Sequence, residues 1–277
     1  MSLLPWPANP ADIHKTLKEI DEHLLLGSEK FIRQQIAKPV NYLVSNPSAC
    51  CDLSSQESFW LNVYSIFNAN QQLNEACNKM WAAAELANIT RDAIWKKKYV
   101  PIGPEFGGIF MTGTLIPTLY YAQISAMISI LSSFGCIPIL VRGTPFYFVR
   151  TKSGWRAIIR RHYIKTVFSK KIKGWHEQII ATYFGLIYRK VALPKLPAKK
   201  IAKLKDMRNE VHYNVLGDLK MWRVPKRHQA YGEFVPVVDR TIVASIAILN
   251  EIKKVTTKCD QRYATLRQAL QSQLKLL

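Results

Sequence analysis

Residues 119–135 read LYYAQISAMISILSSFG and lie within an uncharged stretch of 36 residues, 106–141. A stretch this long and apolar can cross a membrane or form the central helix of a protein core. Eight threonine, serine and glutamine residues interrupt it, and Pro117 and Pro138 leave only 20 residues between them. Small polar side chains that hydrogen-bond to their own backbone are tolerated inside a buried helix. We therefore expect a buried core helix, with a membrane insertion of residues 115–141 as the alternative.

The sequence before this core helix is also predicted to be helical. Between Ile13 and Leu24, apolar residues recur every three or four positions, which is the pattern of an amphipathic helix. Further helices are expected over about 28–44 and 55–95. Residues 96–108, KKKYVPIGPEFGG, then contain two prolines and three glycines. This composition favours a connection between two regions over a regular element.

A short β-hairpin is predicted to interrupt the helical pattern. Two runs, PILVR and FYFVR, flank a Gly-Thr-Pro turn and indicate a small hairpin insertion near 138–150. Helices are expected again over 155–171 and 175–191. The chain is therefore predicted to be mainly α, with an N-terminal helical region over 1–100 and a helical-bundle domain over 101–277.

The formal net charge of +20 is concentrated in residues 142–227, which hold 22 basic and four acidic residues. Residues 1–104 hold ten of each. A segment as basic as this most often binds a polyanion, either nucleic acid or an anionic membrane surface. A solvated cationic surface without a partner is the simpler interpretation. The candidate nucleic-acid-binding residues are Arg156, Arg160, Arg161, Lys165, Lys170, Lys171, Lys173, Lys203 and Lys205.

The cysteines and the N-terminus bear on the cellular compartment. The five cysteines are scattered and show no C-x-x-C spacing, which argues against a disulfide framework and a structural zinc site. The N-terminal residues MSLLPWPANPADIHK lack the basic region and apolar run of a signal peptide. We therefore expect a protein of the reducing cytoplasm.

The sequence LKDMRNEVHYN, residues 204–214, lies inside the basic segment and is the strongest candidate for a catalytic site. On a helix, Arg208 and His212 share one face about 6 Å apart along the axis. A histidine can transfer protons to or from a ribose hydroxyl or a leaving oxygen, while an arginine stabilises charge on phosphate oxygens. Asn209 could hold the arginine or a phosphate, and Tyr213 could stack on a base or donate to phosphate.

This chemistry requires no metal, and we expect neither a metal nor another cofactor. Metal-dependent nucleases need clustered carboxylates, whereas the basic segment has only four acidic residues. One histidine cannot easily serve as base and acid on opposite sides of an in-line displacement. Two copies of the motif helix facing each other across a two-fold axis would supply the second histidine. His162 and His176, also in the basic segment, are alternatives within the chain, although a binding or surface role is the simpler interpretation of each. An arginine and a histidine at this spacing also occur on ordinary helix surfaces, so the spacing alone does not establish a site.

The chain resembles the HEPN superfamily of helical-bundle proteins. The resemblance rests on R-N-x-x-H-Y at residues 208–213 and on the YYA helix at residues 119–135, about 75 residues earlier. Members typically carry an early "YYA…A…LL" helix and a later R-polar-x-x-x-H motif. The usual spacing places four to six residues between the arginine and the histidine, whereas this chain has three. A separation of four positions still keeps both side chains on one helix face.

The resemblance implies a metal-independent ribonuclease that acts as a toxin or antiphage defence effector. By this resemblance, Arg208 and His212 form the catalytic pair, Asn209 is the polar residue after the arginine, and Tyr213 has a looser counterpart. It also implies that the active site forms at a homodimer interface, with RNA as substrate. A regulatory or antitoxin protein is a further expected partner. The alternative function is a non-catalytic module of the same fold that binds RNA or an acidic partner.

Overall fold

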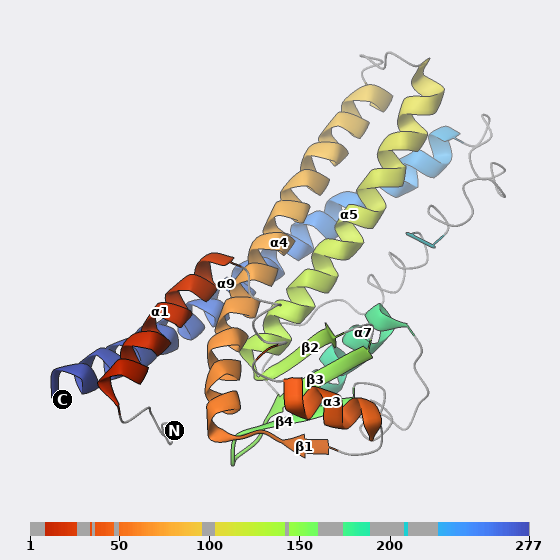
Figure 1. Cartoon of the computed structure of the whole chain (residues 1–277). Helices are drawn as coiled ribbons and strands as arrows, with labels where there is room; N and C mark the ends of the chain where they lie inside the picture. Colours follow the sequence, from red (N-terminus) through yellow and green to blue (C-terminus); the bar gives the residue numbers. More distant parts are fainter. Residues whose placement is uncertain are drawn as a thin grey trace. The chain divides into compact units, whose positions relative to one another are not determined.

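The computed structural model describes residues 9–26, 34, 37–46, 50–95, 103–141, 144–159, 174–188, 208–209 and 227–276. Most of these residues are helical, so the prediction of a mainly α chain is confirmed (Figure 1). The helices are α1 (Pro10–Leu26), α3 (Ala37–Ser45), α4 (Ser55–Trp95), α5 (Gly103–Ser133), α7 (Trp175–Tyr188) and α9 (Arg227–Leu276). The strands are β1 (Cys50–Asp52), β2 (Cys136–Val141), β3 (Thr144–Arg150) and β4 (Trp155–Ile159).

The internal contacts of the chain divide it into two compact units. The first unit comprises Met1–Gln71, Met127–Val191 and Lys253–Leu277, and the second comprises Gln72–Ala126 and Ala192–Ile252. Each unit combines segments from both sides of residue 100, where the sequence predicts a boundary between two regions.

The first unit contains a four-stranded antiparallel sheet with the strand order β1-β4-β3-β2. Strands β2 and β3 form the hairpin expected near 138–150, with Ile137 paired to Phe148. The prediction of a helix over 155–171 is wrong for residues 155–159. These residues form β4, which pairs with both β3 and β1. In this strand Trp155 and Ala157 are buried, whereas Arg156 between them is half-buried. Such alternation is expected because successive side chains of a strand point to opposite faces of the sheet.

Both faces of this sheet are covered. Phe146 and Phe148 are fully buried on one face, and Tyr147, between them, points to the other face. The Tyr147 hydroxyl lies 2.7 Å from Oγ1 of Thr182 on α7, so α7 covers that second face (Figure 1). The first face packs against α3 and the beginning of α4, and its buried cluster comprises Val40, Leu43, Leu61, Tyr64, Ile137, Ile139, Phe146, Phe148, Trp155 and Ala157.

Local interactions define where α4 begins and where α5 ends. Ser54 and Glu57 form a reciprocal capping box, in which each backbone N–H donates to the other residue's side chain. Helix α5 gives way to β2 at Gly135, whose φ of +76° favours glycine over other residues. An added Cβ there would lie 2.7 Å from Cβ of Arg150, so this turn also has no space for a side chain.

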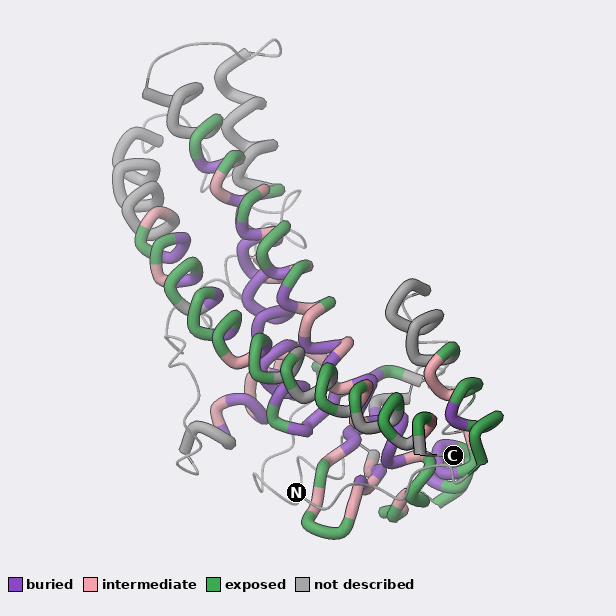
Figure 2. The backbone as a smooth tube through the Cα atoms, turned by 90° about the vertical axis from the view of Figure 1, so that its left-hand side faces the viewer, coloured by how far each residue is buried: buried purple, intermediate pink, exposed green. Residues whose placement is uncertain are grey.

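Helix α5 has the burial expected of a core helix. Among the described residues, Thr114–Ser133 is the one helical stretch long and apolar enough to cross a membrane, and 78% of it is buried within the protein. In the second unit, Nε2 of Gln123 on α5 donates to Oγ of Ser245 on α9 at 3.2 Å, and both side chains are buried. Along α4, by contrast, buried positions recur between exposed and intermediate ones, as amphipathic packing requires (Figure 2).

Candidate active site

The candidate site lies in the second unit, where Arg208 contacts two adjacent tyrosines of α5. Nη2 of Arg208 donates a hydrogen bond to the hydroxyl oxygen of Tyr121 over 2.8 Å. The guanidinium carbon lies 5.6 Å from the ring centroid of Tyr121 and 5.7 Å from that of Tyr120. Both distances are within the range of cation–π attraction. The two rings themselves meet edge to face, with centroids 5.6 Å apart.

Asn209 binds the other terminal nitrogen of the same guanidinium. Its side-chain oxygen accepts a hydrogen bond from Nη1 of Arg208 over 2.9 Å. Arg208 and Asn209 both have helical backbone conformation and are half-buried. Of the two roles that the sequence suggests for Asn209, holding the arginine or holding a phosphate, this geometry provides the first.

The environment allows a positive charge to remain partly buried. Removing a guanidinium from water is costly unless its N–H groups are hydrogen-bonded. Here Nη1 and Nη2 each donate to a side-chain oxygen, whereas the buried Nε is not served by either of these acceptors. The negative faces of two aromatic rings offset a further part of that cost. The resulting group is a planar, permanently charged donor with a fixed orientation. Such a group can bind phosphate oxygens through two parallel hydrogen bonds.

The remaining residues of the predicted motif lie outside the described part of the chain. His212 and Tyr213 are therefore not placed relative to Arg208. Within the described residues, no group of three or more His, Cys, Asp or Glu side chains is arranged to hold a metal ion.

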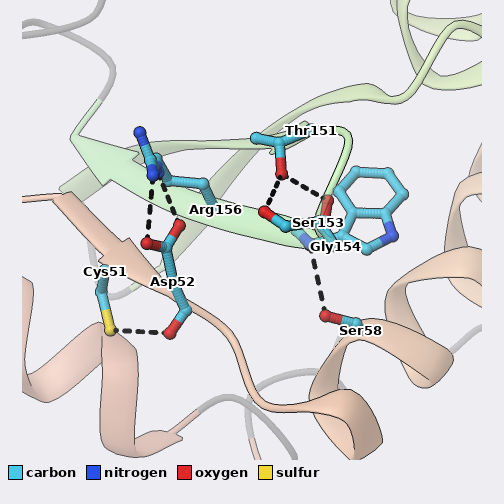
Figure 3. Close-up of polar contacts among 8 residues, drawn as sticks. Cys51, Asp52, Ser58, Thr151, Ser153, Gly154 and Arg156 are labelled. Atoms are coloured by element: carbon cyan, nitrogen blue, oxygen red, sulfur yellow. Dashed lines mark hydrogen bonds and ion pairs between the residues drawn. The ribbon is translucent and has the colours of Figure 1, made fainter. Parts of the chain in front are cut away.

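Of the predicted nucleic-acid-binding residues, the structure places Arg156. It lies on β4 in the first unit, where its Nε and Nη2 donate to the two carboxylate oxygens of Asp52 at 2.6 and 3.0 Å (Figure 3). These hydrogen bonds lower the pKa of the Asp52 carboxyl. Arg208, by contrast, belongs to the second unit. The residues of this set that lie outside the described part are Arg160, Arg161, Lys165, Lys170, Lys171, Lys173, Lys203 and Lys205.

Tyr120 and Tyr121 were not predicted to be site residues. In the sequence they belong to the YYA helix on which the resemblance rests. The contact of Tyr121 with Arg208 spans 87 positions and depends on tertiary packing, which no local pattern reports. The available signal was the presence of two adjacent phenols in a long uncharged helix, since buried tyrosine hydroxyls usually find a polar partner.

Comparisons with protein-family models, with curated proteins and with solved structures found no match to this chain.

Proposed function

We propose that this chain is a metal-independent endoribonuclease in which Arg208 and His212 form the catalytic pair. The observation that carries the proposal is the contact between Tyr121 and Arg208. It brings together the YYA helix and the R-N-x-x-H sequence, the two separate features on which the resemblance rests. A chance resemblance between two short motifs gives no reason for them to meet in space.

In the proposed reaction, the ribose 2′-oxygen attacks the adjacent phosphorus and the bond to the 5′-oxygen of the next nucleotide breaks. The products are a 2′,3′-cyclic phosphate and a 5′-hydroxyl. Arg208 stabilises the charge that builds on the non-bridging phosphate oxygens. His212 accepts the proton of the 2′-hydroxyl, and a second histidine donates one to the leaving oxygen. That second histidine is His212 of a second copy, so the proposal includes a homodimer.

The proposed biological role is that of a cytoplasmic toxin or antiphage effector acting on cellular RNA. The excess of 18 positive charges in residues 142–227 supports binding to an RNA backbone. A ribonuclease of this kind requires control, and a regulatory or antitoxin protein is part of the proposal.

The test is cleavage of a mixed pool of structured RNAs in EDTA by the wild type and by His212→Ala. A matched control is His14→Ala, which removes an exposed histidine of α1 in the first unit. We expect cyclic phosphate ends from the wild type and from the control variant, and no cleavage by His212→Ala. Cleavage by His212→Ala at the wild-type rate would exclude the proposed site.

A non-catalytic RNA-binding protein is the second candidate. It is favoured by the hydrogen bonds from Arg208 to Asn209 and Tyr121, because an arginine that only stabilises a fold makes the same kind of contacts. This candidate predicts salt-dependent RNA binding without cleavage, and equal binding by the wild type and by His212→Ala.

A further inference from the structure

Two side-chain oxygens that accept hydrogen bonds from Arg208 belong to different parts of the chain. Asn209 is the next residue, so its side chain moves with the backbone that carries Arg208. Tyr121 lies on α5, 87 positions away. Helix α5 is in turn joined to α9 by the buried hydrogen bond between Gln123 and Ser245. Tyr121 therefore anchors the guanidinium to the helical framework of the second unit.

We propose that Tyr121 is a positioning residue, whose hydroxyl sets the in-plane orientation of the Arg208 guanidinium for phosphate binding. The inference rests on the proposed function, because orientation matters only if Arg208 acts on a reacting phosphate. It goes beyond that function by assigning a specific task to one atom on another helix.

The geometry separates the tasks of the ring and of the hydroxyl. The guanidinium carbon of Arg208 lies at similar distances from the ring centroids of Tyr120 and Tyr121, so both rings can stabilise its charge. A ring face does not determine how a flat group rotates within its own plane. Acceptors on two different terminal nitrogens do determine it, and Tyr121 supplies one of them. Donors that are oriented before the reaction stabilise developing charge without a reorganisation cost.

The decisive variant is Tyr121→Phe, which keeps the ring and removes the hydroxyl. We expect the rate constant for cleavage to fall about tenfold, the usual scale for losing a hydrogen bond to a charged group. The KM for an RNA that the wild type cleaves should change little, because the charge of Arg208 and the ring against it remain. A merely structural role would lower stability without this split between kcat and KM.

The matched control is Tyr147→Phe in the first unit. Tyr147 is fully buried, and its hydroxyl lies 2.7 Å from Oγ1 of Thr182, so this variant also removes a side-chain hydrogen bond while keeping the ring. We expect a lower Tm for Tyr147→Phe with an unchanged kcat. If both tyrosine variants lose stability and only Tyr121→Phe loses kcat, general destabilisation does not explain the loss.

A second comparison tests whether Tyr121 acts through Arg208. Tyr121→Phe is combined with Arg208→Lys, which keeps the charge but has no planar fork to orient. We expect the tenfold effect of Tyr121→Phe to shrink to less than about twofold in this background, because coupled residues are not additive. Equal losses in both backgrounds, or a wild-type kcat for Tyr121→Phe, would overturn the inference and leave the proposed ribonuclease standing. A wild type that cleaves no RNA would overturn the proposed function and this inference together.

Discussion

The hydroxyl oxygen of Tyr121 lies 2.8 Å from Nη2 of Arg208, and this hydrogen bond joins α5 to a residue 87 positions later. The arginine is half-buried, and its neighbour Asn209 accepts from its other terminal nitrogen. A cation held in this way is oriented as well as stabilised. Orientation is the property that a phosphate-binding arginine needs, and it connects the packing of the second unit to the proposed chemistry.

Phe148→Ala tests the core between the sheet, α3 and α4. The Phe148 side chain is fully buried, so its removal should lower the free energy of unfolding by about 3–5 kcal/mol. The matched control is Phe134→Ala, because Phe134 is 43% exposed in the turn after α5. We expect about 0.5 kcal/mol or less for the control. Denaturant titration of both variants measures the difference, and equal losses would contradict the described core.

Gly135→Ala tests the turn between α5 and β2. The backbone φ of +76° and the 2.7 Å approach of Arg150 Cβ both oppose a side chain at this position. We expect a loss of about 1–2 kcal/mol or more from the strained conformation. Gly174→Ala is the control, since the nearest atom to its added Cβ would lie at an ordinary 3.7 Å. Thermal unfolding should separate the two alanine variants clearly, and a stable Gly135→Ala would contradict the turn.

The Asp52–Arg156 pair predicts a small pH-dependent contribution to stability. Hydrogen bonds from Arg156 lower the pKa of Asp52 in the folded state, so the folded protein binds that proton less readily than the unfolded chain. The contribution is therefore present above the pKa of the unfolded carboxyl, about 3.9, and is lost as the pH falls through the lower folded value. Asp52→Asn should lower the Tm near pH 7 by no more than about 2 °C, because the side chains of Arg156 and Asp52 remain 44% and 65% exposed to solvent. This difference from the wild type should disappear in strong acid, and a difference that grows there would contradict the assignment.

The thiols should differ in reactivity in the folded state. Cys136 is buried, and burial raises its pKa to about 12, whereas Cys50 is exposed. Because the thiolate is the reactive form, a thiol reagent at pH 8 should label Cys50 within minutes and leave Cys136 intact. Cys136 should react once denaturant unfolds the first unit. Peptide mass mapping before and after unfolding gives the result, and early labelling of Cys136 would contradict its position in the sheet.

Much of the helical structure was predictable because it follows local periodicity. The helix expected over 55–95 coincides with α4, whose start is marked by the S-x-x-E pattern at Ser54. The uncharged stretch contains the buried part of α5, and its small polar residues are accommodated there, as Ser133 Oγ donates to the carbonyl of Ser129 one turn earlier. These features depend on interactions between residues near in sequence or on composition alone.

Features that depend on distant pairing were not predicted. Residues 155–159 are too short and too close to a basic helical pattern to be recognised as a strand. They become β4 because Cys51 and Phe148 lie on either side of Ala157 in the sheet. The contact between Tyr121 and Arg208 could not be predicted for the same reason, since only the folded chain brings the two residues together.

The most direct test of the central claim is the single-turnover cleavage rate of Arg208→Lys, measured in EDTA with its RNA affinity. We expect a rate at least about 100-fold below that of the wild type, because lysine keeps the charge but loses the planar fork. RNA affinity should change by less than about threefold, since one contact among many is altered. Arg240→Lys, at an exposed arginine of α9, should retain the wild-type rate. An Arg208→Lys protein that cleaves as fast as the wild type would contradict the account.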